Sequence, residues 1–150
     1  FNPTELAPVT YCTSGTSSSG CVPTLSASGA PSIAASSSFT ITAAQLESQK
    51  LGLFYYGVNG RHLSAWGTSD SFLCVKAPTQ RMGALNSGGG IAACDGTFGQ
   101  DWLAYLATHP GALGTPFAPG QVVNVQGWYR DPASPKTTNL TGGLEFVVIP

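Results

Sequence analysis

The sequence predicts a mainly β protein: an antiparallel β-sandwich of the immunoglobulin or jelly-roll kind, with one short α-helix near residues 98–109. Short strand-like runs recur between turns rich in Gly, Pro and Ser, which is typical of sandwiches. Apolar residues recur at helical spacing in one stretch only, and strands do not alternate with helices as a parallel sheet requires. The chain of 150 residues is long enough for one domain with its own core.

The composition indicates a folded chain with few charges. Charged residues are 9% of the sequence and hydrophobic residues 42%, whereas disorder requires low hydrophobicity and high charge. The net charge of −1 comes without a basic cluster, which excludes a nucleic-acid partner. The apolar runs are too short for a membrane span. We therefore expect a surface of hydroxyl and small side chains, which is common in secreted proteins.

The cysteines predict a disulfide framework. Four cysteines allow three pairings, and short loops rich in Ser or Gly favour the bridges Cys12–Cys21 and Cys74–Cys94. The first would clamp residues 13–20, which contain no apolar residue. Zinc is the alternative, but no Cys-x-x-Cys motif is present. Disulfides are typical of an oxidising compartment, so we expect the protein outside the cell or on its surface.

Residues 1–10 predict an extended N-terminal arm in front of a sandwich domain of residues 11–150. Pro3 and Pro8 exclude a helix and a fully paired central strand. The arm either lies on its own domain or adds as a strand to a neighbouring subunit. Its apolar residues are the candidates for such a contact: Phe1, Leu6 and Val9.

The first half of the domain contains several predicted strands. Residues 38–42 alternate cleanly, and residues 51–56 are strongly β-forming. Residues 43–50 predict a helical turn or a loop, and Asn59-Gly60 is a hairpin signal followed by a loop over residues 61–70. Weaker strands are expected over residues 22–28 and 32–35. Residues 71–77, which contain Cys74, predict a further strand with residues 80–85 as its partner.

The second half contains the predicted helix and the predicted central strand. The helix spans residues 98–109, with Thr97 as its N-cap and Trp102 in its buried face. Residues 120–132 form the longest strand-like run, with either Trp128 or Tyr129 in the core. We interpret the Arg130–Asp131 pair at its end as a structural corner. A turn at residues 141–143 then leads to a last strand over residues 144–149.

The residues that could perform catalysis are scattered, so the sequence predicts no enzyme, no catalytic residue and no cofactor. His62 and His109 are remote, and no Gly-x-Ser-x-Gly elbow is present. Asp70 or Asp95 could join a structural calcium site, although no calcium-binding loop motif is present. Facing pairs for glycoside hydrolysis are not evident among the acids: Glu47, Asp70, Asp95, Asp101 and Asp131.

Aromatic side chains are the remaining candidates for ligand binding, because carbohydrate-binding sandwiches stack sugars on exposed flat rings. Trp66 lies between polar residues in a predicted loop and is the best candidate for stacking. Alternation predicts that one of Tyr55 and Tyr56 points inward and the other outward. Asn139 begins a glycosylation sequon, which marks a surface loop.

Several short motifs stand in one order from residue 11 to the end of the chain: residues 11–16, 20–21, 52–57, 66–76, 93–96, 126–132 and 138–141. Together they resemble a domain that recurs in uncharacterised secreted proteins of planctomycete-type and related environmental bacteria. The resemblance implies secretion and a β-rich module, and it implies no catalytic residue. Residues 1–10 lie outside it.

These observations favour a non-catalytic secreted structural protein. We expect a self-assembling extracellular fibre or surface subunit whose N-terminal arm contacts a neighbour, so that its partners are copies of itself. The alternative is a carbohydrate-binding or adhesion module with a polysaccharide as partner.

Overall fold

The computed structural model describes residues 7–67, 70–91 and 93–150 and confirms a mainly β fold with one short helix. The elements follow along the chain in this order: β1 (Val9–Tyr11), β2 (Thr24–Gly29), β3 (Phe39–Leu46), β4 (Leu51–Gly57), β5 (Arg61–Ala65), β6 (Phe72–Val75), β7 (Gln80–Arg81), β8 (Leu85–Asn86), β9 (Gly96–Asp101), α1 (Trp102–Thr108), β10 (Val122–Arg130) and β11 (Thr138–Val147).

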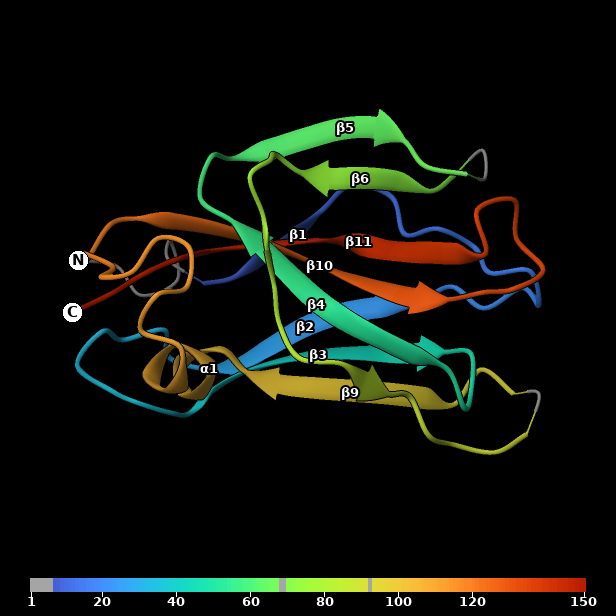
Figure 1. The fold of residues 1–150 in the computed structure, drawn as a ribbon, viewed down its shortest axis with the longest axis horizontal. Helices are drawn as coiled ribbons and strands as arrows, with labels where there is room; N and C mark the ends of the chain where they lie inside the picture. Colours follow the sequence, from blue (N-terminus) through green and yellow to red (C-terminus); the bar gives the residue numbers. More distant parts are fainter. Residues whose placement is uncertain (1–6, 68–69, 92) are drawn as a thin grey trace.

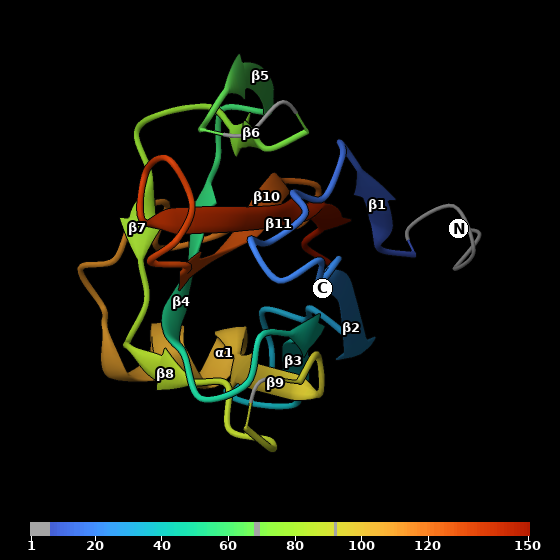
Figure 2. The ribbon, with the colours of Figure 1, turned by 90° about the vertical axis from the view of Figure 1, so that its right-hand side faces the viewer.

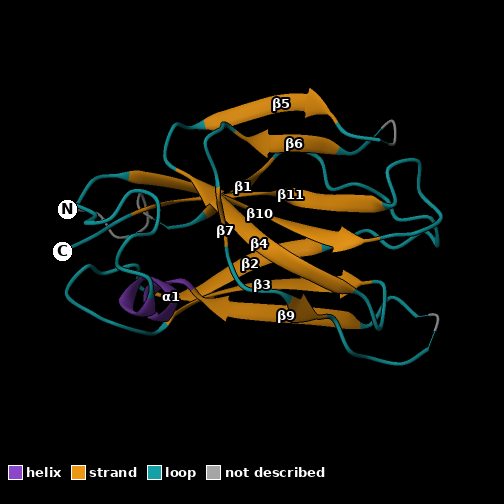
Figure 3. Ribbon diagram, viewed as in Figure 1, coloured by secondary structure: helices purple, strands orange, loops and turns teal. Residues whose placement is uncertain are grey.

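The strands are arranged in three layers (Figures 1 and 2). The middle layer is an antiparallel sheet in the order β1-β11-β10-β4-β7, and β8 also pairs with β4. The sheet β2-β3-β9 covers one face of it and the ribbon β5-β6 the other. Figure 3 shows the single helix at one end, beside β3 and β9. The expected sandwich is present, and a two-stranded ribbon lies on its outer face.

Strand β10 is the predicted central strand, and it is confirmed between β4 and β11. Val123, Val125 and Tyr129 are fully buried in the main core. Gln126 is also fully buried but lies under the ribbon, where its Nε2 donates to the Phe72 carbonyl at 2.8 Å. Because both faces of the sheet are covered, this strand is buried on both sides from Val123 to Gly127.

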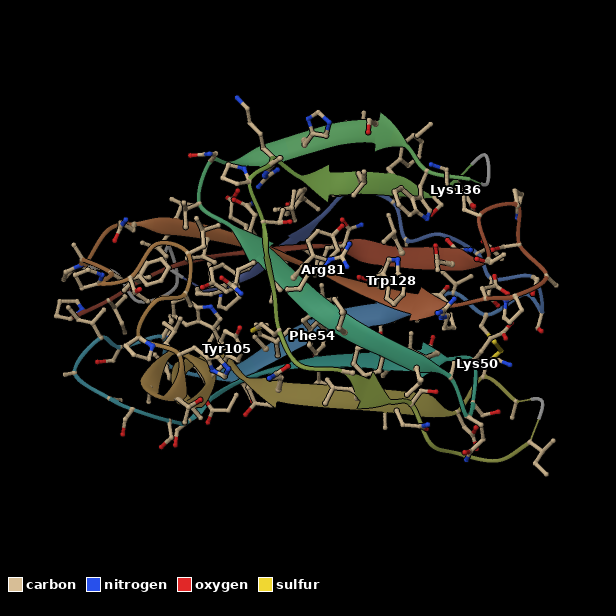
Figure 4. All side chains as sticks on the ribbon, viewed as in Figure 1. Lys50, Phe54, Arg81, Tyr105, Trp128 and Lys136 are labelled. Carbon is tan, nitrogen blue, oxygen red and sulfur yellow. A yellow bond between two sulfur atoms is a disulfide. The ribbon has the colours of Figure 1, made fainter. Side chains whose placement is uncertain are left out.

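The main core is centred on Trp102, whose predicted burial is confirmed at 0% exposure. Its indole lies edge-on to four rings, with centroids 4.9 to 6.4 Å apart, an arrangement that aromatic pairs favour: Phe39, Tyr56, Phe117 and Phe146. Phe54 belongs to the same core and lies in the middle of the molecule in Figure 4. The residue at the start of α1 therefore joins the helix to both sheets.

A second, smaller core lies between the middle sheet and the ribbon. It contains Tyr55, Val75 and Leu140, with Trp66 and Trp128 packed against it. The prediction that Tyr55 and Tyr56 divide into one buried and one exposed residue is wrong, because each face of β4 is covered by another layer.

The predicted helix begins too early. Residues 98–101 belong to β9, which pairs with β3, and α1 starts at Trp102. The N-cap is Asp101, whose carboxylate accepts from the Ala104 amide at 3.1 Å and from the Ser38 amide at 2.6 Å. The predicted cap, Thr97, instead donates its hydroxyl to the Ala43 carbonyl. The side chain of Phe98 is buried from a strand, which imitated helical spacing in the sequence.

The predicted disulfide pairing is wrong. The bridges are Cys12–Cys74 and Cys21–Cys94, with Cα–Cα distances of 6.3 and 5.4 Å. Cys12 follows β1 and Cys74 lies in β6, so the first bridge joins the edge of the middle sheet to the ribbon. Short separation in sequence favoured the local pairing, but the layers place distant segments against each other.

Several local predictions also fail, because pairing between distant segments overrides local signals. Strand β3 continues to Leu46 through the predicted turn or loop, and β5 lies inside the predicted loop of residues 61–70. The Asn59-Gly60 turn joins β4 to β5, which belong to different layers and do not form a hairpin. Residues 141–143 lie within β11, residues 80–81 and 85–86 pair with β4, and residues 32–35 contribute only a bridge at Ser32.

Candidate assembly surface

Strand β1 fixes the beginning of the described chain to the edge of the middle sheet. Tyr11 lies opposite Gly143 of β11, and its hydroxyl donates to the Cys74 carbonyl at 2.7 Å and accepts from Asn124 Nδ2 at 3.1 Å. A Cβ atom at residue 143 would lie 2.5 Å from the Tyr11 ring, so only glycine fits beneath it. Burial raises the pKa of Tyr11 to about 12.

Arg61 of β5 closes over this anchor from the ribbon. Its guanidinium carbon lies 4.4 Å from the centre of the Tyr11 ring. It also donates two hydrogen bonds to Glu145, at 2.9 and 3.1 Å. The hydrogen bond from Arg61 holds the pKa of Glu145 below its usual value. Of the three residues expected to contact a neighbour, Val9 pairs with Glu145 in a strand of its own domain. The other two, Phe1 and Leu6, lie outside the described residues.

The continuation of β1 along β11 is blocked by another segment. Val148 forms hydrogen bonds on the β10 side, where its amide donates to the Gln121 carbonyl. Successive residues of a strand direct their backbone groups to opposite sides, so those of Ile149 face the β1 side. There the Ile149 amide donates to the Pro31 carbonyl at 3.0 Å, and the Ile149 carbonyl accepts from the Ile33 amide at 3.0 Å. Residues 31–33 occupy the place that an extended β1 would need.

Most edge strands in the described part of the chain are protected against pairing with another chain. Strand β1 has three residues, and β7 and β8 have two each. Strand β9 is partly covered, because the Thr97 amide donates to the Ser87 carbonyl at 2.8 Å. Strand β5 begins with Arg61 and has an irregular register against β6. Short length, charge and irregularity are the usual protection of an edge.

The Gln126 side chain caps the other edge of the ribbon. Its Oε1 accepts from the Cys74 amide at 2.9 Å, and its Nε2 donates to the Phe72 carbonyl at 2.8 Å. A buried side-chain amide thus satisfies the outer backbone groups of β6 as a neighbouring strand would.

Strand β2 lacks every one of these protections. Its six residues, Thr-Leu-Ser-Ala-Ser-Gly, include no charge and no proline, and its register with β3 is unbroken. Among the described residues, its backbone is hydrogen-bonded to β3 alone. Thr24, Ser26 and Ser28 point to solvent, while Leu25 is buried. Beside it lies a cavity of about 310 Å³ that reaches across to β1 and Tyr11.

The acidic residues that could have served catalysis hold the loop of residues 13–20 instead. Asp70 accepts from the Thr16 amide at 3.2 Å, and Asp131 accepts from the Ser18 amide at 2.8 Å. The third carboxylate, Glu47, accepts from the Ser17 hydroxyl at 2.8 Å and the Ser19 amide at 3.1 Å. The loop is thus held by hydrogen bonds to distant strands and corners.

The Arg130–Asp131 pair is a structural corner, as the sequence indicated. Asp131 is fully buried, whereas Arg130 is exposed and lies 5.9 Å from the Trp128 ring. Burial raises the pKa of the neighbouring Tyr129, and the charge of Asp131 adds to this effect. The two charged side chains of the pair point to different surroundings and do not act together.

The two histidines lie in different parts of the fold. His62 is exposed on β5. His109 caps the end of α1 and stacks on Tyr105, with ring centres 3.9 Å apart. Within the described part of the chain, no group of three or more His, Cys, Asp or Glu side chains could hold a metal ion. Asp95, the other calcium candidate, accepts from the Gly90 amide at 3.0 Å.

Trp66, the predicted stacking residue, is half-buried against the second core. Its Nε1 donates to the Thr138 hydroxyl at 3.3 Å, and the Lys136 ammonium lies 4.2 Å from its ring centre. Figure 4 shows Lys136 beside the β5-β6 ribbon. A protein cation therefore occupies a position that a stacked sugar would need.

The prediction that Asn139 marks a surface loop is wrong. Its side chain is fully buried in β11, and its Nδ2 donates to the Thr16 carbonyl at 3.0 Å. The amide that a glycan would modify is therefore used to hold the loop of residues 13–20.

Comparisons with models of protein families, with curated proteins and with solved structures find no match to this chain. No helix in the described residues is long and apolar enough to cross a membrane. The two disulfides fit a non-reducing compartment.

Sequence reasoning placed the candidate contact in residues 1–10 but missed its structural setting. The block by residues 31–33 has no local signal, because it depends on a parallel bridge between Ser32 and Ile149. The unprotected edge had a weak signal, namely an uncharged run without proline at residues 24–29. Only the topology shows that this run is an edge.

Proposed function

We propose that this protein is a non-catalytic, secreted structural subunit that assembles with copies of itself through its N-terminal residues. The observation that carries the proposal is the block beyond β1. Because residues 31–33 bind Ile149, the chain before β1 has no place beside Ile149 on its own sheet. We therefore infer that the N-terminal residues pair with a neighbouring subunit.

The low net charge supports the same reading. At −1 for 150 residues, the chain has little long-range repulsion between copies, and a net charge near zero favours association. The bridges Cys12–Cys74 and Cys21–Cys94 support an extracellular location. A head-to-tail contact of this kind builds an open filament when the rotation between subunits does not close.

Sedimentation velocity over a range of protein concentrations tests the proposal. We expect the full chain to form larger species as concentration rises, and a variant without residues 1–6 to remain monomeric. That deletion leaves β1, its register with β11 and both bridges in place. If the full chain stays monomeric at every concentration, or the variant associates equally well, the proposal is wrong.

The alternative function, a carbohydrate-binding module, receives less support. The Trp66 ring is half-buried and faced by Lys136. A polysaccharide binding assay with Trp66→Ala distinguishes the two functions. Binding by the original chain that is lost in a folded variant would favour the carbohydrate module, whereas absence of binding leaves assembly as the better account.

A further inference from the structure

We infer that the free edge of β2 is the acceptor for residues 1–6 of a second copy of the chain, which would add to the sheet β2-β3-β9 as a fourth strand. This inference rests on the proposed function and names the surface that it requires. Among the edges in the described part of the chain, β2 combines a length of six residues with no charge, no proline and no covering segment.

The acceptor edge is long enough to hold an added strand. Six extended residues span about 20 Å, so residues 1–6 can pair along the whole of β2, which has six residues. Added strands gain their affinity from backbone hydrogen bonds, and pockets for side chains give specificity. The cavity of about 310 Å³ beside Thr24 and Leu25 lies next to this edge and can receive a side chain of the donor.

The donor sequence Phe-Asn-Pro-Thr-Glu-Leu fixes which residues can bond. Proline has no amide hydrogen and is accepted in an edge strand when its nitrogen faces away from the partner. Pro3 must then face away from β2, together with Phe1 and Glu5. Asn2, Thr4 and Leu6 direct their backbone groups toward the acceptor, because backbone groups alternate along a strand.

The pairing also accounts for the uncharged acceptor. Glu5 would meet no like charge, because Thr24, Ser26 and Ser28 form the exposed face of β2. After pairing, the former arm becomes the edge of the extended sheet. The donor then carries the two protections that β2 lacks, a proline and a charged residue, so that addition stops after one strand.

Amide hydrogen exchange of the full chain tests the inference at a dilute, monomeric concentration and at an assembled one. We expect alternate amides of β2, together with those of Thr4 and Leu6, to exchange at least about tenfold more slowly on assembly. The amides of Glu5 and of β5 should not change. Assembly without slower exchange of the β2 amides overturns the inference but leaves the proposed function intact. Failure to assemble overturns both the inference and the proposed function. Slow exchange of the β2 amides already in the monomer would show that β2 does not pair with a second copy.

A pair of full-chain variants gives a second test that does not depend on exchange. Ser26→Asp with Ser28→Asp adds like charge next to the donor's Glu5 and should raise the concentration needed for assembly at least about tenfold. The control, Ser36→Asp with Ser37→Asp, makes the same change in an exposed loop and should leave assembly unchanged. Equal behaviour of the two variants would contradict the assignment to β2.

Discussion

The crossed disulfides predict a specific loss of stability when one bridge is removed. Cys21 and Cys94 are separated by 73 residues. With Cys12–Cys74 in place, the shorter path between them runs through that bridge and contains only about 30 residues. The chain-entropy relation gives about 3.6 kcal/mol for closing a loop of this length. We therefore expect Cys21→Ala with Cys94→Ala to lower the free energy of unfolding by about that amount.

The assay is urea unfolding followed by tryptophan fluorescence, because Trp102 is fully buried in the main core. The original chain and the two-alanine variant are compared under the same oxidising conditions, with their midpoints and slopes measured together. A loss smaller than about 1 kcal/mol would refute the reasoning, because the bridge would then constrain the unfolded chain much less than its loop requires.

A variant that lacks one cysteine of each bridge tests the disulfide connectivity itself. Cys12→Ala with Cys21→Ala removes both bridges of the structure, at a cost of about 8 kcal/mol, which exceeds the stability of many domains. It is expected not to fold. If Cys12 paired with Cys21 instead, the same variant would lose only one short loop, worth about 2.6 kcal/mol, and would stay folded with Cys74–Cys94 intact.

Three further predictions concern single side chains. Asp101→Ala should lower the free energy of unfolding by about 1–2 kcal/mol through loss of the N-cap of α1, and Thr97→Ala should leave the helical circular dichroism unchanged. The pKa of Tyr11 is raised from 10.0 to about 12, so its contribution to the free energy of unfolding is complete below pH 10 and is lost as the pH rises through 12. Tyr11→Phe should remove this part of the alkaline loss of stability. An unchanged dependence of the free energy of unfolding on pH would contradict the burial of Tyr11. Asp131→Ala should cost about 2–3 kcal/mol and speed amide exchange at Ser18, whose amide it binds, and a slow Ser18 amide would exclude this role.

The fold class could be predicted from the sequence because it depends on local patterns repeated along the chain. Turns rich in Gly, Pro and Ser, and the long run that became β10, give the β class and the central strand. The burial of Trp102 could also be predicted locally, because a large aromatic residue in an apolar face is buried in either a helix or a strand.

Pairings between distant segments could not be predicted in this way. The short loops of Cys12–Cys21 and Cys74–Cys94 were attractive only while the layers were unknown. The sequon at Asn139 favours a surface loop, but the Asn139 amide is buried and holds the loop of residues 13–20. Burial of polar groups through long-range hydrogen bonds has no local signature.

The candidate assembly surface likewise has one part that the sequence predicts and another that only the fold shows. Residues 1–10 could be selected from the sequence by their prolines and apolar residues, whereas the block at Ile149 and the open edge of β2 require the topology. We propose that they pair, because an added strand can satisfy the free backbone groups of the β2 edge.

Electron microscopy of the full chain, beside the variant without residues 1–6, tests the central claim most directly. Both are prepared at the same concentration and with both bridges of the fold formed. We predict filaments of the full chain and isolated particles of the variant. Isolated particles in both preparations, or filaments in both, would contradict assembly through the N-terminal residues.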